Sequence, residues 1–170
     1  MATVLATRDT AMRTAYLAVL HIGSIKIALP QNEIRTLEPV LDLRRTEAGP
    51  AVGVLELDEG VWPIFSLSED LLPLAELADA RRVCVLLGRD ELAFGIACDK
   101  VVSVPAEQVR AVPAPEVLAR RNSPILSLAV HGEEILCMTT TQALAGLLRS
   151  RGCLEAPHSP AVPAFDQRGA

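Results

Sequence analysis

Cys137, His131 and Glu133 are residues whose types and proximity in the chain could form a nucleophilic site. A histidine held by a carboxylate could take the thiol proton and leave a thiolate nucleophile. Cys137, however, lies inside an apolar run, whereas a reactive cysteine needs an exposed, electropositive position that lowers its pKa. A hydrolase built around Cys137 and His131 is therefore the last of three functional hypotheses.

The other cysteines, Cys84, Cys98 and Cys153, form no C-x-x-C pair and have no histidine at the spacing of a metal site. Cys84 and Cys98 also lie in apolar runs, where cysteine behaves as a small hydrophobic residue. The phosphate-binding patterns G-x-x-x-x-G-K and G-x-G-x-x-G do not occur in the sequence. We predict no enzyme activity, no metal and no cofactor.

Acidic residues form two short groups, Asp58-Glu59 and Glu133-Glu134, each between apolar runs. Such groups could hold a cation or act as an acid–base pair. Charged residues at hairpin tips more often keep a protein soluble. The sequence thus directs attention from catalysis to binding surfaces.

Composition narrows the class of protein further. The chain has 170 residues, of which 50% are hydrophobic and only 3% aromatic, so Val, Leu, Ile and Ala must build its core. A net charge of −5 gives no basic surface for nucleic acid. No apolar run approaches the roughly 20 residues of a membrane span, and the N-terminus does not resemble a signal peptide. We expect a soluble, cytoplasmic protein that binds no nucleic acid and does not insert into membranes.

The elements that would position these residues are short strands paired by glycine-containing turns. Alternating apolar residues and turn signals predict four hairpins and one or two short helices. The hairpins are expected at 16–20 with 25–29, 52–57 with 61–67, 83–87 with 92–98, and 125–130 with 135–139. The helices are expected at 69–72, after Ser68 as N-cap, and at about 141–149.

The first third of the chain reappears 67 positions later. Tyr16-Leu-Ala-Val-Leu20 aligns with Val83-Cys-Val-Leu-Leu87, and the last hairpins correspond at an offset of 73 or 74. Short strands protect their edges by closing into barrels. We predict an all-β fold of two linked small barrels, the first mainly 14–72 and the second mainly 83–140, after a flexible leader at 1–13. Residues 151–170, rich in proline, are expected to be disordered.

Three apolar residues are candidates for contact with a partner. Trp62 either fills the core or enters a groove of another protein. Leu37 stands just before Glu38-Pro39, where a strand leaves the first barrel, and Val104 is its counterpart at the offset of 67. Residues at such exits either close a barrel or bind a partner.

Three stretches together resemble the CheW-like family, the adaptors of bacterial chemosensory arrays. Val52-Gly-Val-Leu-Glu-Leu57 with Val61-Trp-Pro-Ile-Phe-Ser-Leu67 resembles the family's GVxNLRGxxxPVxDL hairpin. Ile96-Ala-Cys-Asp-Lys-Val-Val-Ser-Val104 and the following Pro105 to Arg110 are similar to its LxVDxVxxVxxxxxEQI segment. The hairpin from Ile125 and the helix ending at Leu148 resemble its closing elements. The resemblance covers roughly residues 14–150.

The family has two intertwined SH3-like barrels, each of about five strands, around one hydrophobic core. The resemblance thus implies a non-enzymatic scaffold in chemotaxis signal transduction, which bridges the cytoplasmic tips of methyl-accepting chemoreceptors to the regulatory domain of a CheA-type histidine kinase. Carried over by position, and with Trp62 added, the partner-binding residues would be Thr36, Leu37, Asp58, Glu59, Trp62, Val101, Val102 and Val104.

The chain departs from the family pattern in the first hairpin. The family's Asn-Leu-Arg-Gly is here Glu56-Leu-Asp-Glu59, so a basic residue has become acidic. A charge reversal at a docking surface changes the choice of partner. We therefore expect a divergent adaptor whose output is pilus-based motility or another non-flagellar response. The alternative is a free-standing small β-barrel that binds a peptide or small ligand.

Overall fold

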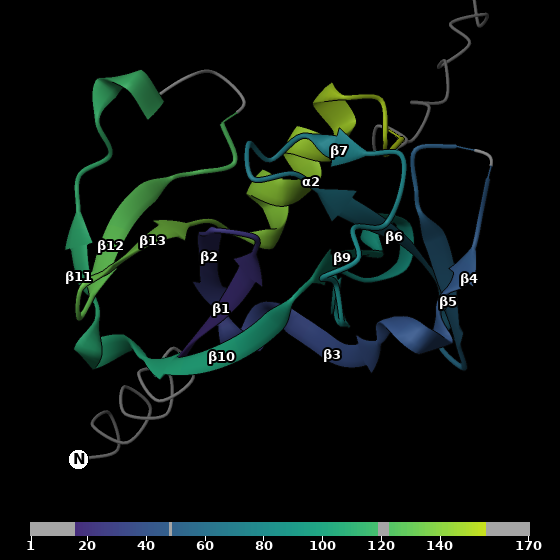
Figure 1. Ribbon diagram of the computed structural model, residues 1–170, viewed down its shortest axis with the longest axis horizontal. Coiled ribbons are helices and arrows are strands. Elements are labelled where there is room, and N and C mark those ends of the chain that lie inside the picture. Colours follow the sequence, from purple (N-terminus) through teal and green to yellow (C-terminus); the bar gives the residue numbers. More distant parts are fainter. Residues whose placement is uncertain (1–15, 48, 119–122, 156–170) are drawn as a thin grey trace, which may run out of the picture.

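The computed structural model describes residues 16–47, 49–118 and 123–155 (Figure 1). The expected leader at 1–13 lies outside the described residues, as does most of the expected disordered segment at 151–170. Both expectations stay predictions. Within the described ranges, no helix is long and apolar enough to cross a membrane.

Short strands joined by tight turns and 3-10 segments make up the first half of the chain. In order they are β1 (Tyr16–Ile22), β2 (Ile25–Pro30), η1 (Gln31–Glu33), β3 (Ile34–Pro39), η2 (Val40–Asp42), β4 (Arg44–Arg45), β5 (Gly53–Leu57), β6 (Gly60–Leu67) and β7 (Pro73–Leu74). The second half again has short strands in succession, with the 3-10 segments placed differently, and adds a helix. Its elements are β8 (Val83–Leu87), η3 (Asp90–Leu92), β9 (Phe94–Cys98), β10 (Lys100–Pro105), η4 (Ala106–Gln108), β11 (Arg110–Val112), η5 (Glu116–Leu118), β12 (Ser127–His131), β13 (Glu134–Met138) and α2 (Thr141–Ser150).

The strands form two curled sheets, which we call barrel A and barrel B. Barrel A has the order β10-β1-β2-β13-β12-β11, and barrel B has the order β3-β8-β9-β6-β5-β4, with β7 beside β6. Both contain one parallel contact, β13 with β2 and β6 with β9. The predicted all-β fold of two intertwined small barrels is confirmed.

The two barrels do not follow the two halves of the chain. Barrel A combines 16–30 with 100–138, whereas barrel B combines 34–74 with 83–98. The expected assignment of one barrel mainly to 14–72 and the other mainly to 83–140 is corrected here. The physical reason is an exchange of third strands: β3 leaves β2 to pair with β8, and β10 leaves β9 to pair with β1. Each exchanged strand covers an edge that the other half would otherwise expose.

One hydrophobic cluster connects the barrels, and each barrel also has a smaller cluster of its own. The shared cluster includes fully buried residues of both barrels, among them Leu20, Ile27, Phe65 and Ile96. Burial of each such side chain contributes roughly 1.5–3 kcal/mol. The shared core therefore makes the two barrels a single cooperative unit.

Helix α2 covers the shared core, at the place predicted for the terminal helix. Its first turn is capped by Thr140, whose hydroxyl accepts a hydrogen bond from the backbone N–H of Ala143 at 3.1 Å. Leu144, Leu147 and Leu148, spaced as one helical face, are buried against the core. Gly152, at φ 71°, then ends the helix in a left-handed conformation.

The helix expected at 69–72 is absent, and a turn takes its place. The hydroxyl of Ser68 accepts from the N–H of Leu72 at 3.1 Å, and the Ser68 carbonyl accepts from the N–H of Leu71 at 2.9 Å. Leu71 is left-handed, with φ 58°, and Pro73 follows two residues later. A helix cannot continue through a left-handed leucine, so Ser68 closes a turn instead of capping a helix.

The hairpin turn between β1 and β2 is fixed to barrel B by two carboxylates. The N–H of Gly23 donates to Asp99 at 3.0 Å, and the N–H of Ser24 donates to Glu69 at 2.7 Å. A Cβ atom on Gly23 would lie 2.3 Å from the Glu69 carboxylate, and φ there is 59°. Arg81 holds Asp99 from the other side at 2.5 Å. This junction sets how the barrels lie against each other.

Candidate functional site

A groove lies between β3 and β10, the two strands that exchange barrels. We call it the crossing groove; Figure 1 shows both strands along the same edge of the molecule. Its volume is about 280 Å³, and it is lined by Ala18, Gln31, Ile34, Leu37, Val101 and Ser103. The Ser103 hydroxyl donates to the side-chain oxygen of Gln31 at 2.6 Å, which ties β10 to the start of η1.

The groove has approximate twofold symmetry. Val101 pairs with Leu20 in barrel A, and Ile34 pairs with Leu87, the residue 67 positions after Leu20, in barrel B. Ser103 and Leu37 are related in the same way, through pairing with Ala18 and Val85. Equivalent residues of both halves thus line one groove. The two sides differ because the β3 side has Leu37 where the β10 side has Ser103.

Two of the candidate residues, Leu37 and Val101, are brought together in this groove. The side chain of Leu37 is 46% exposed, a high value for a leucine in a paired strand. Val101 is half-buried and packs its base on the shared core. Thr36 is next to Leu37 but alternates to the other face of β3, where its hydroxyl donates to the Glu38 carboxylate at 3.3 Å.

Val104 is not a surface residue, which corrects its place among the candidates. It is 5% exposed and packs inside barrel A with Val19, Ala129 and Leu136. The offset between the halves is 67 in the first hairpin but 66 in the third strand. Tyr16 and Val83 are 67 positions apart, but their pairing partners, Pro105 and Pro39, are 66 positions apart. A slip of one residue moves a side chain to the opposite face of a strand. The counterpart of Leu37 is therefore Ser103.

Val102 shares the inner face of β10 with Val104 and is 39% exposed, because β10 is an edge strand. It does not line the crossing groove. Its role in partner contact stays a prediction.

Trp62 also belongs to the core, not to a binding surface. It is 3% exposed and packs with Leu55, Ile64 and Leu86 in the cluster inside barrel B. Its indole N–H has no hydrogen-bond partner among the described residues. The choice between core filling and a partner groove is settled in favour of the core, and Trp62 is withdrawn from the candidates.

The acidic turn at Asp58 and Glu59 is tied to β3 by an ion pair. Arg35 donates through Nε to a Glu59 carboxylate oxygen at 2.8 Å, and its Nη2 forms the ion pair with the same oxygen. Arg35 is the extra residue of a β-bulge between Ile34 and Thr36, which frees its side chain from the regular register. Asp58 is exposed at the tip of the turn. The turn therefore lies beside the strand that carries Leu37.

Arg35 is a site residue that sequence reasoning missed. A bulge leaves little signal in a strand of six residues, and the charge of Arg35 looks like an ordinary exposed residue. The only available signal was the pair of acidic residues at 58 and 59, which need a counter-charge nearby. Charge compensation could have indicated that a basic residue of a neighbouring strand, such as Arg35 of β3, pairs with this acidic turn.

The residues considered for nucleophilic chemistry are not assembled for it. The His131 ring contacts the side-chain oxygen of Gln108 at 3.4 Å, and Cys137 pairs with Leu128 on the neighbouring strand. Burial raises the pKa of the Cys137 thiol, so it stays protonated at neutral pH. The described residues also contain no group of three or more potential metal ligands.

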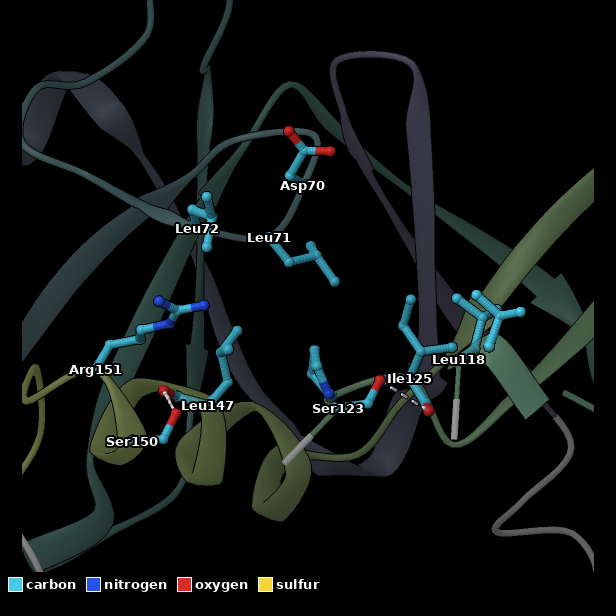
Figure 2. Close-up of a pocket in the computed structure, with 11 residues that line it drawn as sticks. Asp70, Leu71, Leu72, Leu118, Ser123, Ile125, Leu147, Ser150 and Arg151 are labelled. Atoms are coloured by element: carbon cyan, nitrogen blue, oxygen red, sulfur yellow. Dashed lines mark hydrogen bonds between the residues drawn. The ribbon is translucent and has the colours of Figure 1, made fainter. Parts of the chain in front are cut away.

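A second, larger cavity of about 620 Å³ lies beside α2 (Figure 2), and we call it the helix groove. It is bounded by the turn after β6, by η5 and its neighbourhood, and by one face of α2. Its lining residues are Asp70, Leu71, Leu72, Val117, Leu118, Ser123, Pro124, Ile125, Leu147, Ser150 and Arg151. In Figure 1, α2 and β7 lie at the edge of the molecule opposite to β3 and β10, so the two grooves are separate surfaces.

Comparison with known proteins identifies this architecture. No family model and no curated protein sequence matches the chain. The structure is similar to that of the scaffolding protein TtCheW from Thermoanaerobacter tengcongensis, with a TM-score of 0.56 at 13% sequence identity. The match covers 74% of this chain and 88% of that one. The fold is CheW-like. At this identity the similarity concerns the fold. The exchange of β3 and β10 between the barrels brings together the strands that line the crossing groove.

Proposed function

We propose that the chain is a non-enzymatic adaptor of a bacterial chemosensory array. It would act in the cytoplasm and bridge the signalling tips of methyl-accepting chemoreceptors to the regulatory domain of a CheA-type histidine kinase. The observation that carries the proposal is the crossing groove: an apolar, partly exposed surface in a CheW-like fold, formed by equivalent strands of both barrels. The similarity to a CheW scaffolding protein supports the same function.

The groove suits a helical partner better than an extended one. β3 and β10 are edge strands of their sheets, so an extended partner that added a strand to either one would lie along that edge and leave the apolar groove unfilled. Leu37, Ile34 and Val101 instead offer apolar side chains to the ridge of a helix. Receptor signalling tips consist of helices, so we assign them to this groove.

The kinase would contact the barrel surface around the acidic turn. Asp58 is exposed there, and Glu59 keeps about half of its side chain in solvent although it pairs with Arg35. An acidic turn favours a basic counterpart and rejects an acidic one. We propose that the acidic charge of this turn selects the kinase of a non-flagellar system. The support for this part of the proposal is the replacement of a basic residue of the family pattern by Asp58.

Binding measurements with purified partners test the function. Leu37→Asp should weaken binding to a receptor signalling-tip fragment by at least about tenfold, because it places a charge in the apolar groove. Leu126→Asp is the matched control, since Leu126 is 57% exposed and does not line the crossing groove. Absence of binding of the wild-type chain to both receptor tips and CheA-type regulatory domains would reject the adaptor and favour the free-standing binding module.

A further inference from the structure

The helix groove combines an apolar wall with a charged end, and the proposed adaptor function does not use it. Leu72 is 41% exposed and Val117 72% exposed, and both line the cavity. Figure 2 shows Leu71 and Leu147 pointing into the cavity, with Asp70 and Arg151 at its rim. A cavity of about 620 Å³ is in the range of binding sites, about 300–1,000 Å³.

The backbone at the floor of this groove is held in an uncommon conformation. Leu71 has φ 58°, a left-handed conformation that a leucine rarely adopts. The Ser68 hydrogen bonds that close the turn maintain this conformation and direct the Leu71 side chain inwards. Strain of this kind is concentrated at binding sites. The helix groove is therefore already shaped for binding, and no apolar side chain of the described residues fills it.

We propose that the helix groove binds the C-terminal segment of this same chain, residues 156–170. The segment follows Glu155, only four residues after Arg151, which lines the groove. Phe165 is the tenth residue after Glu155, so an extended chain could carry it about 33 Å, enough to return to the groove from the end of α2. Tethering supplies an effective concentration near millimolar, so that even weak apolar contact is sufficient.

The chemistry of the segment is complementary to the groove. Phe165 and Val162 are its large apolar residues, and the other two phenylalanines of the chain, Phe65 and Phe94, are fully buried in the core. Phe165 enters the apolar wall, and the adjacent Asp166 pairs with Arg151 at the charged end. Pro157, Pro160 and Pro163 recur every third residue, the repeat of a polyproline II helix, which reduces the entropy lost on binding.

Hydrogen exchange on the full chain tests this proposal with variants on both sides of the contact. Amides of 161, 162 and 164–166 in the wild-type protein should exchange about tenfold or more slowly than in an unstructured chain; Pro163 has no amide hydrogen. Phe165→Ala and Val117→Asp should each return them to the unstructured rate. Gln167→Ala and Leu126→Asp are the matched controls and should leave the protection unchanged, since Leu126 is exposed but does not line the groove.

Two results would overturn the proposal. One is exchange of residues 161–166 at the unstructured rate in the wild-type chain. The other is protection that increases with protein concentration, which would show that a second copy occupies the groove. The amides of the strands, followed in the same experiment, show whether each variant is folded, and Phe165→Ala changes no described residue. The result does not depend on receptor or kinase binding, so it can fail while the adaptor function stands.

Discussion

Arg81 donates to the carboxylate of Asp99 at 2.5 Å and to the carbonyl oxygen of Leu67 at 2.9 Å, with only 5% of its side chain exposed. Asp99 in turn accepts from the N–H of Gly23 in the β1–β2 turn. One buried guanidinium therefore links the turn of barrel A to β6 of barrel B. Asp99 thus has a structural role, because it joins Arg81 to the turn between β1 and β2.

Removal of this guanidinium should destabilise the whole fold. We expect Arg81→Met to lower the free energy of unfolding by roughly 2–4 kcal/mol, because Asp99 then keeps a partly buried charge without its partner. Urea denaturation measures the change. Arg82→Met is the control, since Arg82 is exposed and its side chain donates only to the carbonyl oxygens of Asp79 and Arg81. Equal losses in the two variants would contradict the role of Arg81.

The second carboxylate of the junction should give a dependence on pH. The hydrogen bond from the Ser24 N–H lowers the pKa of Glu69 below its usual value. A carboxyl group whose pKa is lowered in the folded state stabilises the protein above its unfolded pKa, and this contribution disappears as the pH falls through the folded pKa. Wild type should thus exceed Glu69→Gln in stability near pH 7, and the difference should be lost at an acidic pH below the folded pKa of Glu69.

Urea midpoints of the two proteins at both pH values measure this effect. Glutamine keeps an acceptor oxygen for Ser24, so the comparison isolates the charge. A difference that stays constant between the two pH values would show that the ionisation of Glu69 does not matter at the junction.

The sequence predicts the strands of this fold well but not their partners. Alternation of apolar residues gives the face of each strand, and the first hairpins match at 67 residues in sequence and in pairing: Leu17 pairs with Pro30, and Cys84 with Ala97. Nothing in the alternation states that β3 pairs with β8 of the other half. The exchange of β3 and β10 between the barrels depends on tertiary contacts. In the sequence, only the resemblance to the CheW-like family implied it.

The site was predicted in part, for a reason that lies in strand geometry. Leu37 and Val101 reach the crossing groove, whereas Val104 and Trp62 are buried. The bulge at Arg35 shifts the offset from 67 to 66, and a single residue decides which face a side chain occupies. An apolar residue near a strand end looks the same in sequence whether it closes a barrel or binds a partner.

Core and surface roles can be separated by mutation. Trp62→Ala should destabilise the protein by about 3–5 kcal/mol, because it leaves a cavity among Leu55, Ile64 and Leu86. Leu37→Ala, at an exposed position of the crossing groove, should cost less than about 1 kcal/mol. Thermal or urea unfolding measures both. A small loss for Trp62→Ala would return Trp62 to the candidates for partner contact.

The acidic turn should tolerate a change of charge. Asp58→Arg should alter the free energy of unfolding by less than about 0.5 kcal/mol, since Asp58 is exposed at a turn tip. Its effect should appear in binding, as a shift of preference towards regulatory domains with an acidic contact surface. Glu59→Arg is the informative comparison, because it also breaks the ion pair with Arg35. A large loss of stability in Asp58→Arg would show that the turn is structural.

The cysteines should react in an order set by burial. Burial raises the pKa of Cys84 to about 11 and that of Cys98 to about 12, with nearby Glu38 and Asp99 adding to the shift. Only the thiolate is alkylated, so both should stay unmodified by iodoacetamide near pH 7 until the protein unfolds. Cys137 and Cys153 are half-buried, and burial raises the pKa of both thiols. They should react slowly at neutral pH and faster as the pH rises. Mass spectrometry of native and urea-unfolded protein gives the order. Rapid alkylation of Cys137 in the native protein below pH 7 would contradict this burial and revive the hydrolase hypothesis.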